Sequence, residues 1–324
     1  NEFSSGTPDA MGIRLMSKMF YDRNNNKYKH LLMFGAGNYD NRQLHAKRDC
    51  TILTYEANIS NDEEYSYVCD DFFGILDDNS GIELAKDYLR LGVGRIPSAT
   101  VQEAESDVDK LLEYVNNPDF GFWRDNVVFT ADDYDNGLHA FQAEGINNII
   151  VDELATGMMN NKVYISQFPN DPISDFAYEA RKELISKLTD GQYFMTYVGH
   201  GNQNYLTKHV QLWTTDQSNN VEYPHMPILT TACCDVARYD CNQRGLVEIM
   251  FHKPNGGAIA IVTSARSVYA TDNDALNQAF VRAMFCYNTK GYMPTVGEAY
   301  KLCKQAFGST KANYNKMSFL LLGD

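Results

Sequence analysis

The sequence predicts an α/β fold in which a mostly parallel sheet is covered by helices on both faces. Two apolar runs, within residues 192–202 and 226–240, each stop at a polar turn, as the strands of an open sheet do. Helix-like and strand-like segments alternate along most of the chain, which is typical of parallel strands joined by helical crossovers. The 324 residues, 44% of them apolar and 22% charged, suffice for one large unit or two packed subdomains.

The N-terminal part of the chain is expected to alternate between helix and short strands. Apolar residues recur at helical spacing over residues 7–20, and a buried strand is expected at 30–34. The GxG turn at 35–40 lacks the third glycine and the following helix of a dinucleotide-binding fingerprint, so we interpret it as a loop. Further strands are expected at 51–59 and 89–96.

A strongly amphipathic helix is predicted over residues 101–115. Thr100 and the glutamate three residues later form a capping box at its start, and Pro118 forbids its continuation. We therefore place a boundary here, between an N-terminal α/β subdomain (1–118) and a second α/β subdomain (119–324).

The second part repeats the alternation of strands and helices. Strands are expected at 126–131, 163–167 and 258–264, and helices at 138–153, 173–188, 245–251, 274–285 and 295–307. Residues 318–324 look like a strand that has just finished, so we expect the chain to be a fragment of a longer protein.

The charge of the chain argues against one class of partner. A formal net charge of -14 disfavours nucleic-acid binding, which needs clustered Lys and Arg. No apolar run reaches the roughly 18 residues of a membrane span, and the first residues lack the features of a signal peptide.

Four aspartates near one another in the sequence could hold a structural calcium ion, because hard cations bind several carboxylate oxygens. The spacing of an EF-hand is absent, so a solvated acidic loop is the favoured interpretation. These residues are Asp70, Asp71, Asp77 and Asp78.

The strongest candidates for chemistry are His200, at the end of one apolar run, and the adjacent Cys233 and Cys234, at the end of the other. An imidazole that takes the proton of a thiol creates a nucleophile for carbonyl carbon, and backbone N–H groups such as that of Gly201 can hold the oxyanion. The alternative for each cysteine is burial in the core, which is the common fate of this residue. A metal site built from His200, His209 and both cysteines is disfavoured, because adjacent cysteines rarely share one tetrahedral ion.

The cysteine count adds little to this choice. The spacing of the seven cysteines fits neither a zinc framework nor a small disulfide scaffold, and an odd count leaves at least one thiol unpaired. They are Cys50, Cys69, Cys233, Cys234, Cys241, Cys286 and Cys303.

Seven segments, in order along nearly the whole chain, resemble the gingipain family of caspase-like cysteine peptidases. The resemblance is strongest to its PorU-type branch, the sortases of the type IX secretion system of Bacteroidetes. The segments are residues 1–9, 31–42, 70–76, 91–97, 197–201 (YVGHG), 234–240 (CDVARYD) and 254–261.

The resemblance implies a caspase-like three-layer α/β/α fold in two packed subdomains, the second of them catalytic. It implies that His200 is the histidine of a dyad and that Cys234 is the nucleophile, because the family places this cysteine before an acid and four residues before an arginine, here Arg238. Glu144 is the best match to a glutamate that orients the histidine. Arg266 matches a family segment and is expected to bind a substrate carboxylate or to brace its loop.

The resemblance also implies a function. A PorU-like enzyme would be a cysteine endopeptidase or transpeptidase that cleaves C-terminal secretion signals of type IX cargo proteins through a thioester, with water or the amine of a surface glycan as acceptor. It would act outside the cytoplasm, at the outer membrane or surface of a Gram-negative bacterium, beside other outer-membrane secretion components. No cofactor is expected apart from the calcium considered above. The alternatives are a general secreted gingipain-like protease and a catalytically silent binding module.

Overall fold

The computed structural model describes residues 2–25, 27–44, 51–57, 66–169, 176–287, 289–307 and 314–324. Cys50, the end of the strand expected at 51–59 and the start of the helix expected at 173–188 lie outside the described residues. No helix in the described part of the chain has the length and apolar character needed to cross a bilayer.

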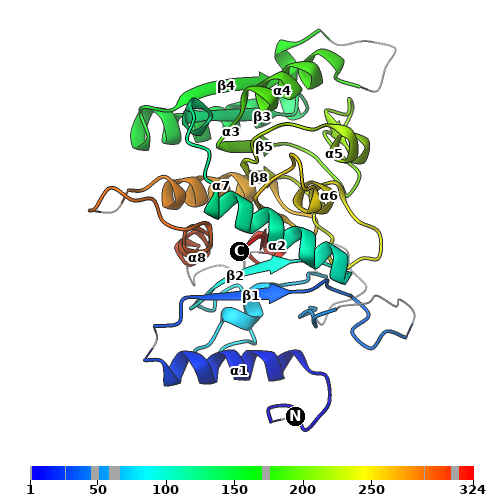
Figure 1. Cartoon of the computed structure of the whole chain (residues 1–324), viewed down its shortest axis with the longest axis vertical. Helices are drawn as coiled ribbons and strands as arrows, with labels where there is room; N and C mark the ends of the chain where they lie inside the picture. Colours follow the sequence, from blue (N-terminus) through cyan, green and yellow to red (C-terminus); the bar gives the residue numbers. More distant parts are fainter. Residues whose placement is uncertain are drawn as a thin grey trace.

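The described residues form one eight-stranded main sheet with the order β1-β2-β10-β9-β8-β5-β3-β4. All neighbouring strands are parallel except β10, which is antiparallel to β9. Figure 1 shows β1 and helix α1 (Ala10–Arg23) at one end of the molecule and β4 near the other. The strands are β1 (His30–Phe34), β2 (Gly92–Ile96), β3 (Asn126–Ala131), β4 (Met159–Tyr164), β5 (Phe194–Val198), β8 (Ile228–Ala232), β9 (Ala260–Ser264) and β10 (Phe319–Leu322).

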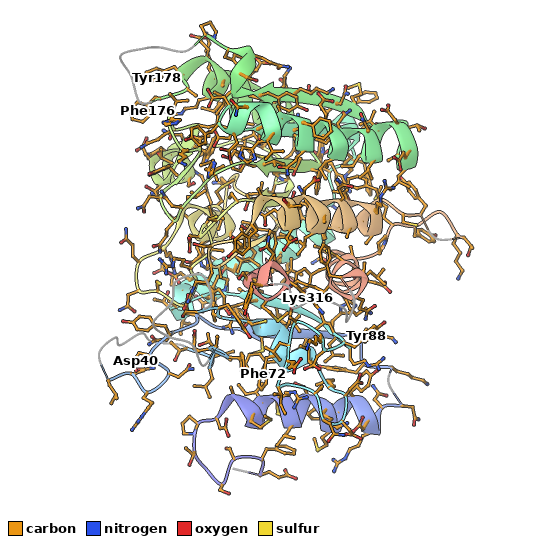
Figure 2. The ribbon with its side chains drawn as sticks, turned by 180° about the vertical axis from the view of Figure 1, so that it is seen from behind. Asp40, Phe72, Tyr88, Phe176, Tyr178 and Lys316 are labelled. Carbon is orange, nitrogen blue, oxygen red and sulfur yellow. The ribbon has the colours of Figure 1, made fainter. Side chains whose placement is uncertain are left out.

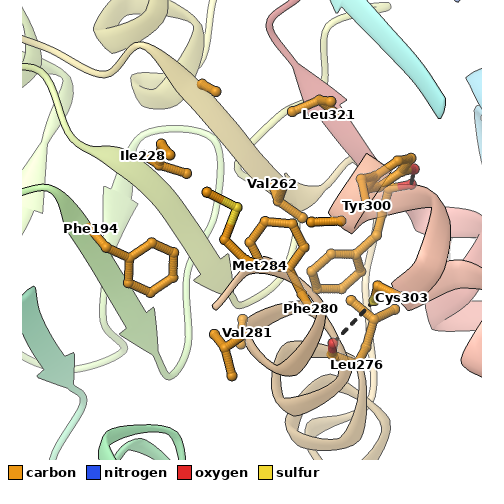
Figure 3. Packing of buried hydrophobic residues seen from close by; sticks show 14 of the residues in the cluster. Phe194, Ile228, Val262, Leu276, Phe280, Val281, Met284, Tyr300, Cys303 and Leu321 are labelled. Carbon is orange, nitrogen blue, oxygen red and sulfur yellow. Dashed lines mark hydrogen bonds between the residues drawn. The ribbon is translucent and has the colours of Figure 1, made fainter. Parts of the chain in front are cut away.

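Helices cover both faces of the sheet, and the α/β prediction is confirmed. Successive strand residues point to opposite faces, and in β5 Phe194 and Val198 join one apolar cluster while Met195 and Tyr197 join the other. The first cluster contains residues of α3 (Leu138–Asn147), α7 (Ala270–Met284) and α8 (Val296–Ala306), and Figure 3 shows part of its packing. The second face carries α2 (Val101–Asn116), α4 (Tyr178–Asp190) and α6 (Leu246–His252).

Shorter elements complete the fold. A two-stranded hairpin is formed by β6 (Tyr205–Leu206) and β7 (Trp213–Thr214), and the short helices are α5 (Thr215–Asn220) and α9 (Tyr314–Ser318). The α2 prediction is accurate: Thr100 Oγ1 accepts from the Glu103 N–H, while the Glu103 carboxylate accepts from Ala99 rather than from Thr100. The boundary predicted after Pro118 stays a prediction, and strands from both sides of it share the one sheet.

The expectation of a solvated acidic loop is wrong for Asp70 and Asp71, which are buried, whereas Asp77 is partly exposed and Asp78 is largely exposed. Both lie in the 3-10 helix η1 (Asp70–Gly74), whose Phe72 lies between α1 and the sheet (Figure 2). Basic side chains engage all four carboxylates in separate ion pairs, and the calcium ion stays a prediction. The ion pairs are Asp70 with Arg95, Asp71 with Lys304, Asp77 with Arg90 and Asp78 with Lys18.

Candidate active site

His200 and Cys234 lie at the same edge of the sheet, at the ends of neighbouring strands. Strands β5 and β8 are parallel, and their register pairs Val198 with Ala232. His200 and Cys234 each follow two residues after these partners, where the carboxyl ends of parallel strands place their ligands. The sheet therefore brings the two predicted residues to one place.

The backbone around His200 is tightly fixed. A Cβ atom at Gly199 would lie 2.5 Å from both Asp132 Cβ and Tyr197 Oη, so only glycine fits there. The buried Tyr197 donates from its hydroxyl to the His200 carbonyl at 2.6 Å, and the His200 N–H donates to Asp132 Oδ2 at 3.2 Å. These contacts fix the backbone of His200, whose side chain is one-third exposed.

The acidic partner of His200 is Asp135, which was not among the residues predicted from the sequence. Its Oδ2 lies 3.0 Å from His200 Nε2. Asp135, Asn136 and Gly137 are three consecutive residues with φ of 59°, 55° and 81°, a left-handed turn that these residue types tolerate. Burial disfavours the charged Asp135 carboxyl, but the hydrogen bond from His200 and the charges of His200, His139 and Lys208 together outweigh it, and the pKa of Asp135 is lowered. The available signal was the Asp-Asn-Gly turn soon after strand β3.

A second imidazole packs edge-on against the first. The His139 and His200 ring centroids are 5.2 Å apart with perpendicular planes, and His139 is buried. Burial lowers the pKa of His139 despite the opposing charge of Asp132. Ligand atoms of Asp132, His139 and His200 all lie within 4.8 Å of one another, so this set has the composition and spacing to hold a metal ion.

Cys234 is partly exposed, and its thiol contacts a backbone segment rather than the histidine. The Val268 N–H donates to Sγ at 3.4 Å and the thiol donates to the Val268 carbonyl at 3.5 Å. Among the described residues, no hydrogen bond joins Sγ to His200. Burial raises the pKa of Cys234, and the bond from Val268 opposes this only in part. The next residue, Asp235, has φ of 58°, so the chain turns sharply after the thiol.

Cys233 points into the core. It is fully buried, and a Cβ at Gly201 would lie 3.0 Å from its Sγ. Burial raises the pKa of Cys233 well above its usual value. This environment suits an inert structural thiol, so the metal site considered from His200, His209 and both cysteines has no support in the geometry.

Gly201 presents its N–H beside the histidine. The Asn202 N–H donates to Tyr205 O and the Thr207 N–H donates to His200 O, one bond on each side of Gly201. Gly201 and Leu206 are therefore a non-hydrogen-bonded pair in a short antiparallel ladder. The Gly201 N–H stays outside the ladder.

The structure does not bring Glu144 to His200, and the predicted contact is wrong. Glu144 Oε2 accepts from Lys162 Nζ at 2.8 Å. It follows five residues after His139 on α3, about 7.5 Å further along the helix axis and about 140° around it. A carboxylate at that position faces β4 instead of the edge where Asp135 and His200 meet.

Arg266 braces its loop, and the expectation that it binds substrate is wrong for this geometry. The guanidinium is 6% exposed and pairs with both carboxylate oxygens of Asp240, at 2.5 and 3.1 Å. It also donates to the carbonyls of Ser66 and Ala265. The N–H groups of the guanidinium are bonded to these protein oxygens, so no pair of them is available to bind a substrate carboxylate.

Comparison with known proteins identifies relatives of this chain. The model of peptidase family C25 matches residues 1–324. The crystal structure of the Arg-specific cysteine proteinase gingipain R (RgpB) is 14% identical, with a TM-score of 0.67 over 100% of this chain and 69% of that chain. The complex of the Porphyromonas gingivalis RgpB pro- and mature domains is 15% identical, with a TM-score of 0.70 over 100% and 70%.

A third structure, dimeric latent PorU from Porphyromonas gingivalis, is 23% identical, with a TM-score of 0.46 over 100% of this chain and 26% of that chain. Comparison with curated protein sequences finds no match to this chain. The similarity to the gingipain structures shows that the sheet and helices described above form the caspase-like gingipain fold.

Proposed function

The chain belongs to peptidase family C25 and is a cysteine-type peptidase of the gingipain kind, and from this premise we propose that Cys234 is its nucleophile and His200 its general base. The observation that carries the proposal is the register of β5 and β8, which delivers both residues to one edge of the sheet. The contrast between a fully buried Cys233 and a partly exposed Cys234 supports the choice of thiol.

The reaction begins with a change of partner for the thiol. Cys234 Sγ leaves the Val268 backbone and turns to His200, whose Nε2 is engaged by Asp135 and whose Nδ1 takes the thiol proton. The sulfur then bonds to the substrate carbonyl carbon while the carbonyl electrons move onto oxygen. The C–N bond breaks as the oxyanion collapses, and the amine leaves with the proton that His200 returns.

The N–H of Gly201 and that of Cys234 are the proposed donors to the oxyanion. Gly201 follows the histidine directly, and its N–H stays outside the short antiparallel ladder described above. Fixed donors aimed at the developing charge are among the largest single contributions to acyl transfer. The thioester is finally attacked by water or by an amine, His200 takes the proton of the attacking group, and the C–S bond breaks to restore the thiol.

We propose further that the substrate is the C-terminal secretion signal of exported proteins and that the acceptor amine belongs to a surface glycan. Support comes from the seven segments that resemble PorU-type sortases, two of which contain His200 and Cys234. The proposal places the enzyme outside the cytoplasm, at the outer membrane or cell surface, beside other secretion components.

The test compares two kinds of substrate with the same protein. A cargo protein carrying a type IX C-terminal signal should be cleaved, while dye-linked Arg and Lys substrates should be cleaved poorly. Adding a small primary amine should divert part of the product to the amide, which mass spectrometry detects. Efficient release of dye from Arg or Lys substrates, with no cleavage of the cargo, would instead identify a general gingipain-like protease.

A further inference from the structure

Around the histidine of the proposed dyad lies a set of metal-ligating side chains, of which Asp132 and His139 take no part in the proposed peptidase chemistry. Asp132, His139 and His200 place one ligand atom each within 4.8 Å of the others. Asp132 and His139 are 1% and 2% exposed, so the set is largely shielded from solvent. Asp135 borders it, with Oδ2 3.0 Å from His200 Nε2 and 3.4 Å from His139 Nε2.

The buried His139 has a ring nitrogen without a hydrogen bond, and this nitrogen faces the set. Its Nδ1 lies 3.4 Å from Gln142 Oε1, and the Gln142 amide is oriented by donating to the Ala270 carbonyl at 3.3 Å. Nδ1 therefore carries the proton, and Nε2 carries a lone pair. Within the described residues Nε2 makes no hydrogen bond, and its contact with Asp135 lacks the geometry of one. A buried polar atom without a partner is costly unless something else satisfies it.

The chemistry of the set selects the kind of ion. Two imidazoles and one carboxylate suit borderline ions such as Zn²⁺, whereas Ca²⁺ and Mg²⁺ require several oxygen ligands. An ion at the centre of three atoms within 4.8 Å of one another lies at most about 2.8 Å from each, against about 2.0–2.2 Å for zinc ligands. Side-chain shifts below about an ångström would bring the three ligand atoms to zinc-binding distances. Gln142 would serve as the outer partner that metal-bound histidines usually have.

We propose that Asp132, His139 and His200 form a binding site for a divalent transition-metal ion of the Zn²⁺ type. Asp135 lies close enough to both imidazoles to add a carboxylate oxygen. Because His200 is a ligand, the bound ion occupies the imidazole that the proposed function assigns as general base. The bound ion is therefore a reversible inhibitor of the peptidase, an inference that rests on the proposed function.

Binding is tested without activity, in the Cys234→Ala variant, which removes the nearby thiol as a competing ligand. Isothermal titration with Zn²⁺ should give one site per chain. Co²⁺ should produce the visible bands of nitrogen and oxygen ligation without a thiolate charge-transfer band. In the same background His139→Asn should weaken binding at least tenfold, and Gln142→Met should weaken it about tenfold.

The matched control is His209→Asn, which removes a histidine next to Tyr134 but outside the set, and it should leave binding unchanged. Thermal unfolding without metal establishes that each variant is folded, and Asp132→Asn replaces His139→Asn if the latter is not. No stoichiometric binding, binding indifferent to both ligand substitutions, or a thiolate band would overturn the site.

Measurements of cleavage test inhibition separately from metal binding. In the parent protein Zn²⁺ should inhibit cleavage, and a chelator should restore it. Stoichiometric binding that leaves cleavage unchanged would support the metal site and contradict the assignment of His200 as general base.

Discussion

Asp135 Oδ2 lies 3.0 Å from His200 Nε2, and the contact joins the turn that follows β3 to the loop that follows β5. A carboxylate in this position fixes the tautomer of the imidazole and stabilises its protonated form. The other imidazole nitrogen is then the one available to the Cys234 thiol. The turn of three left-handed residues, Asp135, Asn136 and Gly137, presents the carboxylate that makes this contact.

Replacement of Asp135 should impair catalysis more than binding. Asp135→Asn keeps the shape of the side chain but loses its charge, so kcat should fall on the order of tenfold to a hundredfold with little change in KM. Glu144→Gln is the matched control, because Glu144 pairs with Lys162, and its kcat should stay within about twofold of the parent. The reverse pattern in steady-state kinetics would restore Glu144 as the orienting acid.

Replacing Cys234 should reduce peptide cleavage, whereas replacing Cys233 should reduce stability. Cys234→Ala should reduce peptide cleavage on the order of a thousandfold or more without a large loss of stability. Cys233→Ala should largely keep activity and lower the free energy of unfolding by about 1 kcal/mol, because it leaves a small cavity beside Gly201. Cleavage assays and urea unfolding measure both quantities. Loss of cleavage in Cys233→Ala alone would reassign the nucleophile.

Replacement of Arg266 should lower the free energy of unfolding. Arg266→Ala leaves Asp240 buried without its partner, and the free energy of unfolding should fall by about 3–5 kcal/mol. The exposed Arg282–Glu153 pair is the matched control, and Arg282→Ala should leave the free energy of unfolding nearly unchanged. Denaturant unfolding compares the two. A raised KM with unchanged stability in Arg266→Ala would show substrate binding instead.

Glu56 should make stability depend on pH. Burial, with repulsion from Asp240, raises the pKa of Glu56 to about 8 in the folded protein. Between pH about 4.3 and 8 the unfolded chain gives up this proton while the folded protein keeps it, so the contribution of Glu56 to the free energy of unfolding decreases as pH rises through that window.

In Glu56→Gln the side chain stays neutral. The variant should match the parent below about pH 4 and be more stable above pH 8, on the order of 5 kcal/mol, since the window from about 4.3 to about 8 spans almost four pKa units and one unit is worth about 1.4 kcal/mol. Urea unfolding at several pH values measures the difference. A stability difference that does not vary with pH would contradict this account of Glu56.

The features predictable from the sequence were those set by local pattern. The apolar runs that became β5 and β8 and the polar turns after them placed His200 and Cys234 at one sheet edge. The cap at Thr100 fixed the start of α2 in the same way. The strand ends and the helix cap needed only the residues of the element itself, whereas the choice of Cys234 over Cys233 rested on the resemblance to the gingipain family.

The features that could not be predicted from the sequence depend on partners distant in the chain. The burial of Asp70 and Asp71 follows from Arg95 and Lys304, which no local pattern connects to them. Likewise, β10 lies between β2 and β9 because of long-range pairing. Asp135 reaches His200 only through a left-handed turn, whereas Glu144 was chosen by a match that crossed gaps.

The most direct test of the dyad is the rate of alkylation of Cys234 by iodoacetamide as a function of pH, mapped by mass spectrometry in the parent and in His200→Ala. Because burial raises the pKa of Cys234, its reactivity near neutral pH must depend on proton transfer to His200. The rate should fall at least tenfold in His200→Ala and its midpoint should move to higher pH, while the exposed Cys286 reacts equally in both proteins. Identical profiles for Cys234 in the two proteins would contradict the assignment of His200 as its base.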